Sequence, residues 1–190
     1  MTTDRLVAFT DGVIAILITI MVLELKPPAG TGIGDLHTVV PKLLAYLLSF
    51  VLVGIYWINH HHLFHVVEKI DGAVLWSNMA LLFSLSLVSL ATAWFGEHPG
   101  STGPVFWYAI VQLLCAISYT LMTISLLRLH DPESRLAKAI GDDRKGKWSM
   151  LAYVVSVPIS LVAPAITVAI IAGVAIAWFV PDRRVSRVLD

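Results

Sequence analysis

The chain has 190 residues, of which 57% are hydrophobic and 14% are charged, and its thirteen Lys and Arg residues balance thirteen Asp and Glu residues. Soluble domains average about 25% charged and about 45–50% apolar residues, so this composition excludes an ordinary soluble domain, a disordered chain and a disulfide-rich secreted scaffold. The zero net charge gives no electrostatic basis for binding nucleic acid, and the single cysteine, Cys115, excludes an intrachain disulfide. The sequence therefore predicts an all-α, polytopic membrane protein.

Apolar stretches long enough to cross a bilayer recur along the chain. A transmembrane helix needs about 20 mostly apolar residues, and four stretches meet this length. A fifth stretch of 33 residues would form a helix of about 50 Å, and Pro158 and Pro164 near its middle favour two short helices instead. The predicted spans are residues 5–25, 43–64, 72–95, 104–127, 148–163 and 165–180, within a single domain covering residues 1–190.

The distribution of Lys and Arg predicts the orientation of these six spans. Eleven basic residues fall on one side of the membrane and two, Lys26 and Lys42, on the other. Cytoplasmic loops carry the excess of basic residues, so we expect both termini in the cytoplasm. Asp11 interrupts the first apolar stretch, which argues against a signal peptide. The eleven basic residues on the predicted cytoplasmic side are Arg5, Lys69, Arg128, Arg135, Lys138, Arg144, Lys145, Lys147, Arg183, Arg184 and Arg187.

Polar side chains fall at one depth in three of the predicted spans. Polar groups inside a span are costly, and they mark function or an internal hydrogen-bond network. We expect Asp11 to accept hydrogen bonds from His, Asn or Trp donors, with Arg5 as a counter-charge. The layer comprises Arg5, Thr10 and Asp11 in the first span, Trp57, Asn59, His60, His61 and His62 in the second, and Trp76, Ser77 and Asn78 in the third.

The run of histidines between His60 and His65 also permits a metal-binding interpretation. His61 and His65 are four residues apart and share a helical face. The other histidines, His37, His98 and His130, are scattered. Histidines in a polar network or at the membrane interface are therefore the favoured interpretation, and we expect no bound metal or cofactor.

One face of the first span forms an apolar stripe that ends at an acidic residue. Its members recur at helical spacing, and such a stripe in a membrane helix most often packs on another helix or on lipid. Glu24 follows the stripe, either as a charge at an entrance or as a solvated helix end paired with Lys26. The stripe consists of Gly12, Ile16, Thr19, Ile20 and Leu23.

The first span opens with the sequence Arg-Leu-Val-Ala-Phe-Thr-Asp, residues 5–11. This sequence resembles the R-x-x-x-F-S-D motif that opens the transmembrane protein 175 family, and Thr10 keeps the hydroxyl of the usual Ser. The family includes the lysosomal potassium channel of animals and shorter bacterial relatives. The similarity continues with six spans, with Glu24 and Pro27 after the first, with the stretch Trp57, His60 and His61 in the second, and with Trp76 and Asn78 in the third.

The resemblance implies a homotetramer of six-helix subunits around a central cation pore lined by the first span. The family lacks the Thr-Val-Gly-Tyr-Gly filter of ordinary potassium channels, and its constriction is apolar. Carried over by position, this constriction falls on Ile16, Ile20 and Leu23, with Thr19 offering a hydroxyl and Glu24 at the outer mouth. The resemblance also implies that Arg5, Phe9, Thr10 and Asp11 hold the pore helix to the next two spans through Trp57, His60 and Asn78. It leaves open which histidine pairs with Asp11.

The expected function is therefore a potassium-preferring cation channel in a bacterial cell membrane, and not an enzyme. Its expected partners are lipid, other copies of the chain and monovalent cations, with K⁺ as the permeant ion. Three alternatives stay open. A secondary transporter would place ionisable groups near the midplane and contain inverted repeats. A membrane metal-binding protein would use the cluster from His60 to His65, and a structural subunit would only bind a partner.

Overall fold

The structure is a computed structural model that describes residues 2–179 of the chain. Seven α-helices and one 3₁₀ helix make up this part, which confirms the all-α class. The helices are α1 (Thr3–Leu23), η1 (Ile33–Thr38), α2 (Val40–His65), α3 (Gly72–Glu97), α4 (Thr102–Leu129), α5 (Arg135–Ile140), α6 (Arg144–Ser160) and α7 (Pro164–Phe179).

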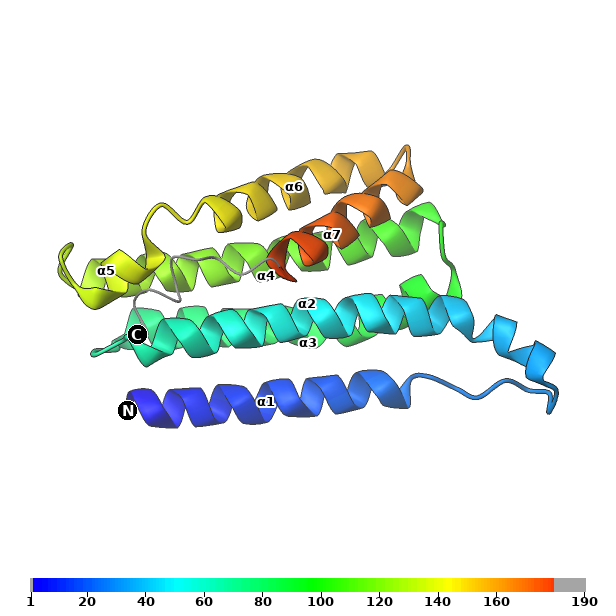
Figure 1. Ribbon diagram of the computed structural model, residues 1–190, viewed down its shortest axis with the longest axis horizontal. Helices are drawn as coiled ribbons and strands as arrows, with labels where there is room; N and C mark the ends of the chain where they lie inside the picture. Colours follow the sequence, from blue (N-terminus) through cyan, green and yellow to red (C-terminus); the bar gives the residue numbers. More distant parts are fainter. Residues whose placement is uncertain (1, 180–190) are drawn as a thin grey trace.

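The long helices lie side by side in one bundle (Figure 1). α1 lies at one edge and packs against α2 and α3, whereas α6 and α7 lie at the opposite edge and pack mainly against each other and against α4. The most extensive contact joins α3 to α4 in the middle of the bundle. α1 is therefore held from one side, and its other side faces away from the subunit.

Four of the helices, α1 to α4, are long and apolar enough to cross a membrane. The chain is a multi-pass membrane protein. α6 has 17 residues and α7 has 16. A helix of this length extends about 24–26 Å, which is shorter than the hydrocarbon core of about 30 Å. A full crossing by α6 and α7 remains a prediction.

A proline begins α7 and turns the last apolar stretch into a helical hairpin. Pro164 occupies the first helical position, where the missing backbone N–H is no loss. The turn between the helices falls where the sequence predicts it, although Pro158 lies inside α6. Four residues used above, namely Val180 at the predicted end of the last span and Arg183, Arg184 and Arg187 of the basic count, lie outside the described residues.

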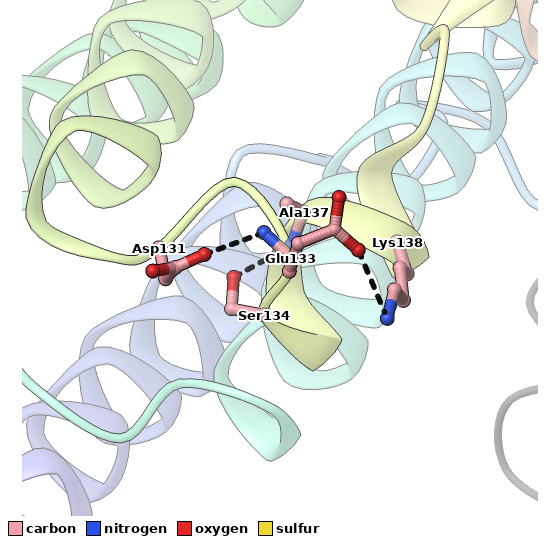
Figure 2. A network of polar contacts seen from close by, with 5 residues as sticks. All are labelled: Asp131, Glu133, Ser134, Ala137 and Lys138. Atoms are coloured by element: carbon pink, nitrogen blue, oxygen red, sulfur yellow. Dashed lines mark hydrogen bonds and ion pairs between the residues drawn. The ribbon is translucent and has the colours of Figure 1, made fainter.

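The polar segment after α4 contains the short helix α5. The carboxylate of Asp131 accepts a hydrogen bond from the backbone N–H of Glu133 at 2.8 Å (Figure 2). The hydroxyl of Ser134 then accepts one from the backbone N–H of Ala137 at 3.2 Å and so caps the start of α5. Leu136 is completely buried and anchors this helix to the bundle.

Basic residues gather at one end of the bundle. Of the ten Lys and Arg residues in the described chain, eight belong to the start of α1, the α2–α3 connection and the segment from the end of α4 to the start of α6. These segments lie at the same end (Figure 1). Lys26 and Lys42 belong to the other end, where Lys42 forms an ion pair with Glu97 at 3.2 Å. This arrangement agrees with the predicted orientation but does not test it.

Gly96 marks the closest approach of α3 to the start of α2. A Cβ atom at this position would lie 3.0 Å from the Cα of Lys42 and 3.3 Å from the Cβ of Ala45. We expect Gly96→Leu to push the two helices apart and to lower the free energy of unfolding by about 1–3 kcal/mol. The measurement is the Tm of the purified protein in detergent. The control is Gly173→Leu on α7, where nothing lies within 4 Å, and an equal loss of Tm in both variants would contradict the prediction.

Candidate pore helix and polar network

α1 has one buried face. Its buried residues recur every three or four positions, which places them on one side of an α-helix. They contribute to the apolar core that α1 shares with α2 and α3. The buried residues are Leu6, Thr10, Ile14, Leu17 and Met21.

The opposite face of α1 carries the apolar stripe that the sequence predicts. Ile16, Ile20 and Leu23 are 58%, 41% and 78% exposed, and Gly12 and Thr19 are also exposed. The Thr19 hydroxyl donates a hydrogen bond to the carbonyl of Ile16 at 2.8 Å. Its proton is therefore used within α1, while its oxygen can still accept. This surface is apolar along the helix, and no other described residue of the subunit covers it.

Arg5 and Phe9 lie on the exposed face of α1 and not against the neighbouring helices. Phe9 is 50% exposed, and Arg5 is also exposed. Arg5 forms no ion pair with Asp11 in the described chain, so the expected counter-charge is wrong for the subunit. The two residues are six positions apart, which separates their side chains by about 120° around the helix. Arg5 instead lies on the same side of the helix as Ile16, about three turns nearer the N-terminus.

Glu24 ends α1 as its C-cap residue and is exposed. Among the described residues it forms no ion pair with Lys26, which the sequence offered as one of two roles. A carboxylate at the C-terminal end of a helix is unfavourably placed, because the helix dipole is negative there. Glu24 therefore presents its charge to the surroundings at the end of the exposed face.

A hydrogen-bonded chain of buried side chains joins α1, α2 and α3. The amide nitrogen of Asn78 donates to the hydroxyl of Thr10 at 2.9 Å, and its amide oxygen lies 3.1 Å from Nε2 of His60. All three residues are buried. Because the amide oxygen can only accept, Nε2 of His60 must carry the proton and donate it. Asn78 thus satisfies one polar group on each neighbouring helix.

Asp11 is joined to α2 by a tryptophan. The indole Nε1–H of Trp57 donates to the carboxylate of Asp11 at 2.9 Å. Among the described residues, no histidine bonds to Asp11, and Nε2 of His60 bonds to Asn78 instead. Nδ1 of His60 has no hydrogen-bond partner in the described chain, and the ring stacks on Phe64 with a centroid distance of 4.4 Å.

The other residues of the predicted polar layer are peripheral to this network. Asn59 and Ser77 donate to carbonyl groups of their own helices, at 2.7 and 3.0 Å. Trp76 is 77% exposed, and His61 and His62 are exposed as well. Successive residues of a helix point about 100° apart, so residues that are adjacent in the chain do not share one network. Across the described part of the chain, no group of three or more His, Cys, Asp or Glu is placed to hold a metal ion.

A second buried polar chain, which the sequence analysis does not single out, lies nearer the other end of the bundle. The hydroxyl of Thr92 lies 2.6 Å from that of Ser49, which in turn lies 2.8 Å from the hydroxyl of Tyr108. These residues belong to α3, α2 and α4. Hydroxyl residues inside apolar spans are the signal for such contacts, but their spacing alone does not show which of them meet.

His130, one of the histidines outside the run from His60 to His65, forms hydrogen bonds with the α2–α3 connection and with the end of α4. Its Nε2 lies 3.3 Å from the backbone nitrogens of both Glu68 and Lys69, and its Nδ1 lies 2.8 Å from the carbonyl oxygen of Leu126. Since a backbone N–H can only donate, Nε2 accepts and Nδ1 carries the proton. The end of α4 and the connection between α2 and α3 are thereby tied together.

Comparison with known proteins places this helix bundle in a family. The sequence profile of the family described as "Endosomal/lysosomal potassium channel TMEM175" matches residues 5–88, which contain α2 and most of α1 and α3. A protein named a potassium channel, from Chryseobacterium sp. (strain P1-3), is 44% identical over 189 residues, covering 100% of this chain and 98% of that protein. The chain belongs to the TMEM175 family. The resemblance of residues 5–11 is thereby confirmed.

The similarity to TMEM175 proteins extends beyond the profile match. A protein named a potassium channel, from Streptomyces collinus (strain DSM 40733 / Tue 365), is 30% identical over 176 residues, covering 87% of this chain and 85% of that protein. The crystal structure of a lysosomal potassium-selective channel TMEM175 homolog from Chamaesiphon minutus matches with a TM-score of 0.77 at 28% identity, covering 93% of this chain and 96% of that chain. The family resemblance thus includes α4, α6 and α7.

The network predicts a specific effect of removing the Asn78 amide. We expect Asn78→Leu to leave Thr10 and His60 without partners in a buried site and to lower the free energy of unfolding by about 1–3 kcal/mol. The readout is the Tm of the purified protein. Asn59→Leu is the matched control, because Asn59 bonds only to its own helix, and its Tm should change much less. Equal Tm values for Asn78→Leu and the unmodified protein would show that the network contributes no stability.

Proposed function

We propose that this chain is the subunit of a homotetrameric, potassium-preferring cation channel whose pore is lined by α1. The observation that carries the proposal is the uncovered apolar face of α1, at the edge of the bundle, on a chain whose full-length relatives are named potassium channels. The name of the Chamaesiphon minutus homolog also describes a potassium-selective channel. No observation favours a transporter or a metal-binding protein.

The position of α1 allows several copies to meet at one axis. α1 contacts α2 and α3, while α4, α6 and α7 lie on the far side of those helices (Figure 1). Four subunits with α1 turned toward a common axis would cover the exposed face and leave a narrow neck. The neck would be formed by Ile16, Ile20 and Leu23, and the exposed Arg5 and Phe9 would be available for contacts between neighbouring copies.

The neck would conduct by wetting and drying. Hydrophobic constrictions gate by dewetting, so a cation crosses only when the ring of branched side chains is wide enough for the ion and water. Selectivity then comes from the cost of dehydration and from pore width, with the Thr19 oxygen replacing part of the hydration shell. We expect K⁺ to be preferred over Na⁺, but less strongly than in a filter of carbonyl groups. Four exposed Glu24 carboxylates would raise the local cation concentration at the outer mouth.

The polar network would fix the direction in which the neck residues point. Thr10 is bonded to α3, and Asp11 is bonded to α2. Rotation of α1 about its own axis breaks both bonds. Ile16 follows less than two turns later on the same continuous helix, so these bonds set its orientation.

The remaining expectations concern placement in the membrane. We propose six crossings, with α6 and α7 as a short hairpin, and a cytoplasmic location for the end that holds the start of α1. The gathering of eight basic residues at that end supports this orientation. The cellular location would be the plasma membrane of a bacterium.

Ion flux tests the assignment of the neck. We expect liposomes containing the purified protein to pass K⁺ faster than Na⁺, and Ile16→Asn to increase the flux and to alter the ratio of K⁺ to Na⁺ and Cs⁺, because a polar ring wets more easily. Ile176→Asn on α7 is the control. Ile176 is 67% exposed, close to the 58% of Ile16, but lies on a helix remote from α1.

Three results would contradict this assignment or the channel function. Unchanged flux and ion ratio in Ile16→Asn would remove Ile16 from the constriction. The same change in Ile176→Asn would show that any polar residue on the exposed surface makes the membrane leak. Absence of flux in all liposomes would favour a structural subunit over a channel.

Assembly tests the role of Asp11. We expect Asp11→Ala to reduce the tetramer, because Trp57 loses its acceptor and α1 is no longer held in one rotation. The mass of the detergent-solubilised complex, measured by light scattering, is the readout. Asp4→Ala, at an exposed position in the first turn of α1, should assemble normally. A stable Asp11→Ala tetramer that conducts normally would exclude Asp11 from this role.

A further inference from the structure

A groove opens between α2, α4, α5, α6 and α7. It encloses about 770 Å³, and α1 and α3 contribute none of its described lining. More than half of its lining residues are apolar or aromatic, and they come from α2 and α4 on one side and from α5, α6 and α7 on the other. Representative lining residues are Ile55, Ile58, Leu63, Ala116, Tyr119 and Phe179.

One end of the groove is cationic. Arg144 and Lys145, in the first turn of α6, both line it there. Arg144 is exposed and forms no ion pair within residues 2–179, whereas the Lys145 ammonium lies 5.6 Å from the ring centroid of Trp178. Asp143 lines the same end, and its carboxylate accepts a hydrogen bond from the backbone N–H of Gly146 at 3.1 Å as the cap of α6. Among the described residues that line the groove, these two cations outnumber the one carboxylate.

The aromatic wall beside these cations is held in place. The indole Nε1–H of Trp178 donates to the hydroxyl of Ser149 at 3.0 Å, which joins the end of α7 to the start of α6. Tryptophan is enriched at the depth of lipid headgroups, where an apolar ring and a polar N–H are both satisfied. The first turn of α6, which carries Arg144 and Lys145, lies at the end of the bundle where the other basic segments gather (Figure 1).

We propose that this groove binds an anionic phospholipid, with the headgroup phosphate at Arg144 and Lys145 and an acyl chain along α2 and α4. Basic pockets between transmembrane helices are suited to anionic headgroups, and the guanidinium of Arg144 matches two phosphate oxygens. A free phosphate ion would leave the apolar wall uncovered, so the length of that wall favours a lipid. Lipid binding at this groove requires only that the chain lies in a membrane. An experiment that finds no lipid binding would therefore leave the proposed channel function untouched.

Native mass spectrometry of the full-length protein in detergent tests the site. The probes are phosphatidylglycerol and phosphatidylcholine with the same acyl chains. We expect phosphatidylglycerol to bind in preference. In the double variant Arg144→Gln/Lys145→Gln, the ratio of phosphatidylglycerol binding to phosphatidylcholine binding should fall about fivefold for each charge removed.

The chain offers a matched control. Lys138 and Lys147 lie at the same end of the bundle but outside the groove lining, and they pair with Glu133 and Asp142, both at 3.5 Å. The double variant Lys138→Gln/Lys147→Gln removes the same charge and should keep the preference for phosphatidylglycerol. Equal binding of both lipids to the unmodified protein, or equal loss in the two double variants, would overturn the proposal.

A second measurement does not depend on the folding of the charge variants. Brominated phosphatidylglycerol should quench the tryptophan fluorescence of the unmodified protein more than brominated phosphatidylcholine does, and Trp178→Phe should reduce the difference. Displacement of the lipid by excess inorganic phosphate would overturn the proposal in favour of a plain anion site. Lipid binding only in a variant that ends at Phe179 would overturn it in favour of the chain's own last residues as the occupant.

Discussion

The amide of Asn78 is the contact on which the orientation of α1 depends. It uses its donor on Thr10 of α1 and its acceptor on His60 of α2, so one side chain of α3 fixes two neighbouring helices. Apolar packing alone is tolerant of small rotations, because lipid is as apolar as the helix surface. A directional hydrogen bond is not tolerant in this way. The bond between Trp57 and Asp11 adds a second point of attachment nearer the surface.

This attachment divides the subunit into two sides with different surfaces. The face of α1 is apolar and bare, and its family relationship makes it the proposed lining of a pore. The groove with a cationic end lies between α2, α4, α5, α6 and α7, and none of its described lining belongs to α1. A ligand in this groove would act on the outer wall of the assembly without touching the permeation path. The two proposals therefore rest on separate residues.

The fold was largely predictable because its signals are local in the sequence. Long apolar stretches gave four helices with bounds close to those expected, and the prolines at 158 and 164 indicated the hairpin of α6 and α7. η1 was not predicted, since its Gly-rich surroundings carry no helical periodicity. Depth along each span indicated the layer in which polar residues meet, although Asn59, Ser77 and Trp76 of that layer stay outside the network. It could not give their pairing, which depends on the rotation of each helix. Within the described subunit Arg5 is therefore not the counter-charge of Asp11, and the partner of Asp11 was left open.

The contacts between helices are also ordered along the chain. α1 packs mainly on α2 and α3, α3 packs most extensively on α4, and α6 packs on α4 and α7. Once synthesis has reached Glu97, the main partners of α1 are therefore present, and so are the partners of Asn78, namely Thr10 and His60. The later helices then extend this unit and add further buried bonds, such as that between Ser49 and Tyr108. Local contacts of this kind favour rapid folding. In the proposed tetramer, the exposed apolar face of α1 would therefore be complete early in synthesis and would stay in lipid until other copies reach it.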